Sequence, residues 1–355
     1  MLEALPAVLY ALGFSWRKRP LVRKFFGGRE LRFIGRVTEV PEGATVAVWA
    51  SGPFGTGFPA AAPDIASGGA TEFPFTRLFV EDGFLRSVGL GADLVRPLSW
   101  VIDRRGIYYD GSRPSDLEHD LQTRVFDDTQ LIRAARVRQN LVASGLTKYN
   151  VGTDIWSRPL QAGGKPVVLV VGQVETDASI RYGAPGIKTN LALLQAARQA
   201  HPDAWLVYKP HPDVVAGLRG QGAQEQQAAR WSDQIVTDVA MGALLDAVDI
   251  VHVMTSLAGF EALLRGKQVV CHGLPFYAGW GLTQDVLPIL RRTRKLGVDE
   301  LVAGVLLEYP TYVSRVTGQI CPAEQALAEL QALRSVAQPG VPVWRKIVRR
   351  LIKRP

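Results

Sequence analysis

A series of short apolar runs that alternate with helical patterns constrains the fold of this chain more than any other feature. The runs occupy residues 167–171, 205–208, 250–254 and 268–271. Helical patterns lie between them, near residues 190–200, 225–231 and 257–265. Apolar runs without polar alternation are typical of strands buried on both faces, and strands that alternate with helices form a parallel sheet. The pattern therefore predicts a doubly wound α/β domain in this half of the chain.

The amino-terminal half carries the same kind of signal in fewer elements. Apolar runs predict buried strands at residues 45–49 and 77–80, and a helical pattern runs from Asp127 to Ser144. A chain of 355 residues suits two domains, each of roughly 150 residues. We therefore predict two Rossmann-type doubly wound parallel-sheet domains with a cleft between them. The predicted boundaries are 1–150, 151–322 and, for terminal helices, 323–355.

Composition and charge narrow the class of protein. Hydrophobic residues make up 47% of the chain and charged residues 21%, which are ordinary values for a globular protein. The net charge of +8 favours an anionic partner. The basic residues gather at the two ends of the chain with little aromatic interleaving across the body, so we expect no nucleic-acid partner.

The sequence also predicts a cytoplasmic protein. Its two cysteines, Cys271 and Cys321, form neither a CxxC pair nor a disulfide framework. Apolar residues 2–12 precede the first cluster of basic residues instead of following it, which makes a poor signal peptide. No apolar run approaches the roughly 18 residues that span a bilayer.

Four clusters of polar residues follow predicted strands, at the positions where ligands bind in open α/β sheets. The first is Glu81-Asp82-Gly83, after the run at 77–80. Two carboxylates in this position can supply a general base that takes a proton from an attacking hydroxyl. Asp-Gly is also ordinary turn chemistry, so a structural role is the alternative.

The second cluster runs from Gly172 to Ser179 and contains two acids, Glu175 and Asp177. A carboxylate at this strand end can act as a nucleophile toward an anomeric carbon. The alternative is that Thr176 or Asp177 only caps the helix that follows.

The third cluster is the stretch from Tyr208 to Asp213, which reads Tyr-Lys-Pro-His-Pro-Asp. Its two prolines fix a loop that holds Lys209 beside His211, where the two side chains can neutralise a phosphate. A histidine in such a loop points to a ligand more than to core packing. Structural roles are favoured instead for the histidines that lie between elements or in apolar strands, which are His201, His252 and His272.

The fourth cluster begins with Thr255 and Ser256, whose hydroxyls lie at a predicted helix N-terminus and can bind a phosphate. Glu261, about one turn later, can accept hydrogen bonds from a ribose. Serine or threonine is also the commonest structural N-cap, which is the alternative. The sequence has no Walker A, GxGxxG or HExxH motif, so it predicts neither a metal nor another cofactor.

These clusters, in this order, resemble those of the capsular polysaccharide β-Kdo glycosyltransferases of the KpsC/LipA type. The resemblance extends from near the N-terminus to Tyr312. The matching stretches are residues 81–91, 106–110, 172–180, 208–213, 255–261 and 275–283. The resemblance implies a GT-B-like fold, a CMP-Kdo donor, a Kdo-containing glycolipid acceptor and retention of the β configuration.

The chain is also similar to bacterial sialyltransferases, which share an acidic-Gly motif and a His-Pro motif. By that similarity, Glu81 or Asp82 occupies the acidic-Gly position. His211 and Pro212 occupy the His-Pro position, and Ser256 that of a phosphate-binding serine. The predicted donor site is completed by Gln173, Lys209, Thr255 and Glu261.

Retention implies two displacements, in which an enzyme carboxylate holds the sugar covalently between them. By the resemblance, Asp177 is the expected nucleophile and Glu175 the second candidate. Arg86 and Arg181 are candidates for pairing with the sugar carboxylate, because a guanidinium matches a carboxylate with two hydrogen bonds. Each is equally compatible with a surface cation.

Members of this family typically carry two such modules in tandem, whereas this chain carries one. Its opening residues 13–20 look more like the start of the second module.

Residues 344–354 alternate apolar and basic positions at helical spacing, which is typical of a helix that lies on an anionic membrane surface. We therefore expect a peripheral protein on the inner face of the inner membrane. A helix packed on the protein with a solvated basic face is the alternative.

Two other functions fit parts of this pattern. A CMP-sialic-acid transferase would share most clusters, and a non-catalytic capsule-export or glycan-binding component would share the fold. Asp177, His211 and the Glu81–Asp82 pair favour an enzyme, because a binding module needs no nucleophile.

Overall fold

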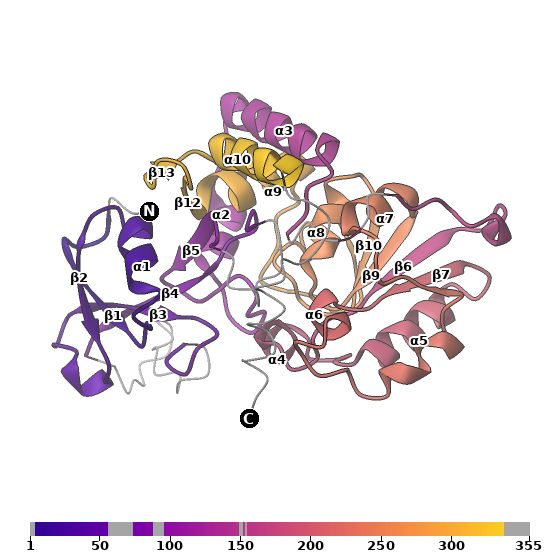
Figure 1. The fold of residues 1–355 in the computed structure, drawn as a ribbon, viewed down its shortest axis with the longest axis horizontal. Coiled ribbons are helices and arrows are strands. Elements are labelled where there is room, and N and C mark those ends of the chain that lie inside the picture. The colour runs from indigo at the N-terminus through magenta and orange to yellow at the C-terminus, as the bar shows by residue number, and fades with distance from the viewer. Residues whose placement is uncertain (1–3, 56–73, 88–95, 149–151, 153–154, 337–355) are drawn as a thin grey trace.

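A computed structural model describes residues 4–55, 74–87, 96–148, 152 and 155–336 of the chain. Two β-sheets lie side by side, each with its own helices, and a further group of helices lies across one end of the pair (Figure 1). The α/β class and the predominantly parallel sheets predicted from the sequence are confirmed.

The second sheet is entirely parallel among the described residues. Its order is β11-β10-β9-β6-β7-β8. The strands are β6 (Val167–Val171), β7 (Trp205–Lys209), β8 (Gln234–Ile235), β9 (Ile250–Val253), β10 (Gln268–Cys271) and β11 (Gln284–Asp285). The four strands expected from apolar runs are all present, because side chains of β6 and β9 are buried on both faces of the sheet.

The first sheet is mixed, with the order β13-β12-β5-β4-β3-β1-β2. Its strands are β1 (Val8–Leu12), β2 (Glu30–Ile34), β3 (Thr45–Trp49), β4 (Thr76–Asp82), β5 (Ser99–Asp103), β12 (Pro310–Val313) and β13 (Ile320–Cys321). β1 to β4 are parallel neighbours, whereas β5, β12 and β13 pair antiparallel. The prediction of a purely parallel first sheet is wrong, because β5 turns back antiparallel beside β4. Strands β12 and β13, which return from the second half of the chain, also pair antiparallel with their neighbours.

The helices agree with the predicted pattern and add to it. They are α1 (Arg19–Phe25), α2 (Asp116–Thr123), α3 (Asp128–Ala143), α4 (Ala178–Gly183), α5 (Asn190–Ala200), α6 (Pro212–Val215), α7 (Met241–Ala247), α8 (Leu257–Leu263), α9 (Val298–Val302) and α10 (Ala323–Val336). Asp127 caps α3 through a capping box with Gln130. The helix expected near 225–231 is a 3-10 helix, Glu225–Arg230, and a π-helical segment spans Ala303–Glu308.

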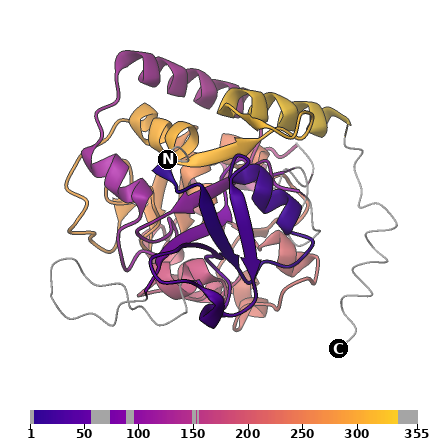
Figure 2. The ribbon, with the colours of Figure 1, turned by 90° about the vertical axis from the view of Figure 1, so that its left-hand side faces the viewer.

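The end of the described chain packs on its amino-terminal half. Helix α10 lies beside α3 (Figure 2), and Arg133 Nη2 of α3 donates a hydrogen bond to Glu324 Oε2 of α10 at 2.8 Å. Strands β12 and β13 join the first sheet although they belong to the part of the chain assigned to the second domain. The domain boundaries themselves stay a prediction.

One hydrophobic core joins the two sheets. Val48, Phe79 and Val101 of the first sheet and Leu169 and Val251 of the second belong to it. The alternate side chains of each sheet face smaller cores on the far sides, which contain Phe25 of α1 and Leu194 of α5. Within the described ranges, no helix is long and apolar enough to cross a membrane.

Candidate functional site

Glu81 and Asp82 end strand β4 on opposite faces of the first sheet, because side chains alternate along a strand. Glu81 lies two residues after Phe79 and so faces the same side of the sheet, toward the core shared by the two sheets. Asp82 lies two residues after Val80 and so faces the other side, which α1 covers. There its Oδ2 accepts a hydrogen bond from Arg86 Nε at 2.6 Å. The predicted acid pair thus consists of one acid beside the second sheet and one acid in an ion pair.

The pKa of Glu81 is raised from 4.5 to about 7. Burial is the largest cause, because it disfavours the charged carboxylate, and the negative charge of Asp82 acts in the same direction. A hydrogen bond from Ser51 and the positive charge of Lys148 oppose the rise. Oε2 of Glu81 has no hydrogen-bond partner among the described residues. A carboxylate with a pKa near neutrality is suited to take a proton from a hydroxyl.

Two residues of the second cluster hold the loop after β6 in place. The side-chain amide of Gln173 accepts a hydrogen bond from the Thr255 backbone N–H at 2.8 Å and donates one to the Thr255 hydroxyl at 3.0 Å. Glu175 accepts hydrogen bonds from the backbone N–H groups of Asn190, at 2.7 Å, and Ala223, at 2.8 Å. Because each carboxylate oxygen of Glu175 already accepts a backbone hydrogen bond, the geometry favours a loop-stabilising role for Glu175.

Asp177 differs from Glu175 in that its carboxylate is not used to hold the backbone. It is the N-cap residue of α4, yet its side chain accepts no capping hydrogen bond from the helix. The alternative of a plain capping aspartate therefore has no support in the geometry. Burial raises the pKa of Asp177, and the positive charges of Arg219 and Lys148 oppose that rise. The two cations favour the ionised form that a nucleophile requires, against the effect of burial.

Lys209 lies buried at the end of β7. Its Nζ donates hydrogen bonds to the carbonyl oxygens of Val239, at 2.6 Å, and Thr237, at 3.5 Å. Burial lowers its pKa to about 8, and the charge of Asp238 opposes this change. The ammonium of Lys209 thus holds the loop at residues 237–239, and its predicted contact with a phosphate stays a prediction.

His211 caps helix α6, and Pro212 is the first residue of that helix. The Nδ1 atom of His211 accepts a hydrogen bond from the Asp213 backbone N–H at 3.2 Å. Burial, followed by the charges of Lys148 and Arg219, lowers the pKa of His211 to about 4. The imidazole is therefore neutral near pH 7, and since Nδ1 accepts, its proton lies on Nε2. This arrangement gives the site one N–H donor of fixed direction.

The fourth cluster opens helix α8 as predicted. Ser256 is the N-cap, with its hydroxyl 3.3 Å from the Ala258 backbone nitrogen. Glu261 lies buried on the same helix and accepts a hydrogen bond from the Lys148 backbone N–H at 2.7 Å. Burial raises the pKa of Glu261 to about 7, against the opposing charge of Arg265. Glu261 therefore joins α8 to the segment that follows α3.

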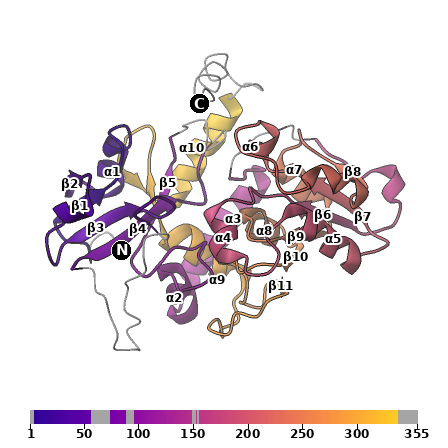
Figure 3. The ribbon, with the colours of Figure 1, turned by 90° about the horizontal axis from the view of Figure 1, so that it is seen from below.

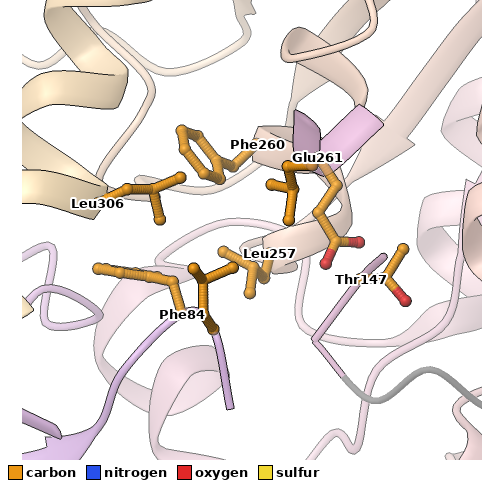
Figure 4. Close-up of a pocket in the computed structure, with 8 residues that line it drawn as sticks. Phe84, Thr147, Leu257, Phe260, Glu261 and Leu306 are labelled. Atoms are coloured by element: carbon orange, nitrogen blue, oxygen red, sulfur yellow. The ribbon is translucent and has the colours of Figure 1, made fainter. Parts of the chain in front are cut away.

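A small pocket lies beside Glu261, lined by residues of α3, α8, the π-helical segment and the segment after β4 (Figure 4). The Glu261 carboxylate lies toward Thr147, while Phe84, Leu257 and Leu306 face the other side of the space. This largely apolar lining accounts for the desolvation of Glu261, and it offers few groups that could hydrogen-bond a sugar.

Lys148 and Arg219 connect the clusters, and neither was singled out from the sequence. The charge of Lys148 acts on Glu81 of the first sheet and on Asp177 and His211 of the second. Arg219 acts on Asp177 and His211, and its backbone N–H donates to the Asp213 carbonyl at 3.1 Å, which folds the loop back onto α6. The base candidate, the nucleophile candidate and the imidazole thus all lie within the electrostatic influence of Lys148. Figure 3 shows α4 and α6 on the side of the second sheet nearest the first.

The two arginines proposed for the sugar carboxylate are placed differently. Arg86 is buried and bonded to Asp82 and, at 3.0 Å, to the Ser87 hydroxyl. Arg181 is exposed on α4, and its guanidinium carbon lies 5.3 Å from the centroid of the Tyr182 ring. Neither arginine has a geometry that singles it out for a ligand carboxylate.

Across the residues that the structure describes, no group of three or more His, Cys, Asp or Glu side chains could hold a metal ion. Three histidines form a hydrogen-bonded row instead. His201 Nε2 lies 3.0 Å from His252 Nε2, and His252 Nδ1 lies 3.0 Å from His272 Nε2. This row agrees with the structural roles expected for these residues.

Comparison with known proteins decides the family. The chain matches the family described as "Capsule polysaccharide biosynthesis protein" over residues 66–150 and 133–320. The chain belongs to this family. The resemblance predicted from the sequence is thereby confirmed, and its strand-end motifs lie within or beside the matched residues.

Relatives within the capsule family agree with this assignment. The capsule polysaccharide modification protein LipA of Neisseria meningitidis serogroup B is 43% identical over 331 residues, which cover 91% of this chain and 45% of LipA. The lipopolysaccharide-processing protein LpsZ of Rhizobium meliloti is 45% identical over 265 residues, which cover 74% of this chain and 59% of LpsZ. The chain therefore spans about half the length of the curated relatives that it matches.

Two solved structures of KpsC from Thermosulfurimonas dismutans are similar over nearly their whole length. The β-Kdo 2,7 transferase has a TM-score of 0.75 at 38% identity, with coverage of 92% of this chain and 99% of that one. The β-Kdo 2,4 transferase has a TM-score of 0.78 at 29% identity, with coverage of 93% and 99%. The family member described here is thus similar in fold and sequence to Kdo transferases.

Proposed function

We propose that this chain is a GT-B-like glycosyltransferase that moves Kdo from CMP-Kdo to a Kdo-containing glycolipid acceptor of capsule biosynthesis, with retention at the anomeric carbon. The observation that carries the proposal is the similarity to the two KpsC Kdo transferases over nearly their whole length. The charge of Lys148, which acts on Glu81, Asp177 and His211, supports one shared site. A base from one sheet and a nucleophile from the other are what a two-step transfer requires.

In the first step, the Asp177 carboxylate attacks the anomeric carbon of the donor sugar, and the bond from that carbon to the phosphate oxygen of CMP breaks. The leaving phosphate gains negative charge as the bond breaks. Lys148, Arg219 and the Nε2–H of His211 stabilise that charge without a metal ion. Thr255 and Ser256, at the N-terminus of α8, take the nucleotide side of the donor.

In the second step, Glu81 takes the proton of an acceptor hydroxyl, whose oxygen attacks the anomeric carbon and displaces Asp177 as a free carboxylate. Two inversions restore the original configuration. Glu81 serves here rather than Asp82, because Asp82 is held by Arg86 at 2.6 Å. Glu81 ends the cycle protonated and returns its proton to water.

The identities to the two Kdo transferases favour one linkage. The chain is 38% identical to the 2,7 transferase and 29% identical to the 2,4 transferase. We infer that the product is the 2→7 linkage, which linkage analysis of the product tests directly.

Trapping the covalent intermediate tests the function and the nucleophile together. The chain is incubated with CMP-Kdo and no acceptor, and intact-protein and peptide masses are measured. We expect one Kdo adduct on the peptide that contains Asp177, and none in Asp177→Ala. Asp203→Ala, which changes an exposed acid, is the matched control and keeps the adduct. An adduct that survives in Asp177→Ala refutes the nucleophile, and an adduct from CMP-sialic acid but not from CMP-Kdo refutes the donor.

A peripheral location on the inner face of the inner membrane is part of the proposal. The basic, amphipathic pattern at residues 344–354 supports it. These residues lie outside the described part of the chain.

A further inference from the structure

Lys18 lies beside the Glu81–Asp82 pair and takes no part in the steps above. It directly precedes α1, and its Nζ lies 3.6 Å from the centroid of the Trp49 ring. The Lys18 side chain is partly covered by protein but stays accessible to solvent, and it forms no ion pair within the described ranges. A cation over an indole ring is held by the electron-rich face of the ring.

The position of Trp49 explains why Lys18 lies at the site. Trp49 is the last residue of β3 and pairs with Val80 of the parallel strand β4. Glu81 and Asp82 are the next residues along β4. The Trp49 ring also contacts Trp100 at a centroid distance of 5.3 Å, and Trp100 pairs with Asp82. Lys18, Trp49 and Asp82 therefore lie on the α1 side of one sheet edge, and Glu81 ends the same strand beside Asp82 and faces the second sheet at that edge.

The charges at this edge leave Lys18 available to a ligand. Asp82 is held by Arg86 at 2.6 Å. The charges of Asp82 and Glu81 both act on Lys18, although burial is the larger influence and lowers its pKa. An ammonium has three N–H donors, and an aromatic face does not use all of them. Lys18 is thus held in place by the ring while it keeps donors for an acceptor group.

We propose that Lys18 binds the carboxylate of an acidic sugar at the end of the acceptor and so places that sugar's hydroxyl beside Glu81. The inference rests on the proposed function, because a Kdo-terminated acceptor carries one carboxylate on the sugar that must reach the base. Lys18 is a positioning residue in this proposal. The donor also carries a carboxylate, so the test separates acceptor from donor.

Steady-state kinetics with CMP-Kdo and a Kdo-terminated oligosaccharide tests the assignment. We expect Lys18→Met to raise the acceptor KM about tenfold, which corresponds to the loss of one charge-assisted hydrogen bond. The donor KM changes much less, and Lys18→Arg restores most of the acceptor affinity. With an acceptor whose terminal carboxylate is a methyl ester, wild type and Lys18→Met have the same acceptor KM.

Arg17→Met is the matched control, because Arg17 is an exposed cation beside Lys18 that lies over Trp16 at 5.3 Å instead. An equal rise of acceptor KM in Arg17→Met overturns the proposal, as does an unchanged acceptor KM in Lys18→Met. A larger effect on the donor KM than on the acceptor KM assigns Lys18 to the donor and also overturns it.

A binding titration makes the inference testable apart from catalysis. The Kdo-terminated oligosaccharide is titrated calorimetrically into wild type, Lys18→Met and Arg17→Met without donor. Weaker binding in Lys18→Met alone supports the subsite even if CMP-Kdo is not turned over, in which case only the donor assignment fails. Equal binding by all three proteins overturns the subsite while leaving transferase activity intact.

Discussion

We predict that the pH dependence of the proposed transfer reflects the buried carboxyl of Glu81. If Glu81 is the general base, only its ionised form accepts the acceptor proton, so the rate with limiting acceptor follows the ionised fraction. With a pKa of about 7, that fraction rises from about one tenth near pH 6 to about nine tenths near pH 8. We therefore expect kcat/KM for the acceptor to increase roughly tenfold over this interval.

Two substitutions move the midpoint of this profile in opposite directions. The charge of Lys148 lowers the pKa of Glu81, so Lys148→Met shifts the midpoint to higher pH. The charge of Asp82 raises that pKa, so Asp82→Asn shifts the midpoint to lower pH. Lys165→Met, at an exposed site, leaves the midpoint in place and serves as the control.

The assay is initial-rate transfer from saturating CMP-Kdo at several pH values, with donor hydrolysis measured in parallel. Glu81→Gln should abolish the acceptor-dependent rise. A profile that is flat between about pH 6 and pH 8, or a midpoint near the ordinary glutamate pKa of 4.5, refutes the assignment of Glu81 as base. A Lys148→Met shift to lower pH contradicts the electrostatic argument.

The remaining predictions concern stability and membrane binding. Burial, together with the charges of His272 and His201, lowers the pKa of His252 from 6.5 to about 3. Above pH 6.5, His252 is therefore neutral in both the folded and the unfolded state. At lower pH, the unfolded state binds a proton that the folded state does not. The contribution of His252 to the free energy of unfolding is therefore lost as pH falls, by about 2 kcal/mol near pH 5. Urea unfolding should show a loss of stability between pH 7 and pH 5 that is larger in wild type than in His252→Asn by this amount. An equal loss in both proteins contradicts the prediction. Removal of residues 344–354 should weaken sedimentation with anionic vesicles at low salt, and unchanged sedimentation removes the membrane role.

Local sequence pattern was sufficient for much of the second sheet. The run from Val167 to Val171 has apolar side chains on both faces, and only a central strand of a covered sheet buries both. Antiparallel strand β5 and the returning strands β12 and β13 were missed. Strand β5 pairs with β12, which is distant in sequence, and no residue within strands this short specifies the direction of a partner strand.

The candidate site likewise contains residues that the sequence predicted and residues that only the structure revealed. The strand-end clusters, including Asp177 and His211, were found because parallel strands place their carboxyl ends at one edge. Lys148 and Arg219 were missed because they lie on loops away from any strand end, where a basic residue is most often a solvated surface cation. The family resemblance ranked Asp177 before Glu175, and the structure adds a physical reason, since the backbone N–H groups of Asn190 and Ala223 already use the Glu175 carboxylate.

The sequence by itself determined which residue types end the strands, and hence the chemistry that the chain carries: carboxylates, an imidazole and helix-terminal hydroxyls. Tertiary structure decided which of these groups are free to react. Glu81 and Asp82 are adjacent in the chain, yet the pleat of β4 turns one toward the shared core and the other toward Arg86. Burial and neighbouring charge then set their protonation, and both are properties of packing that a linear pattern does not contain.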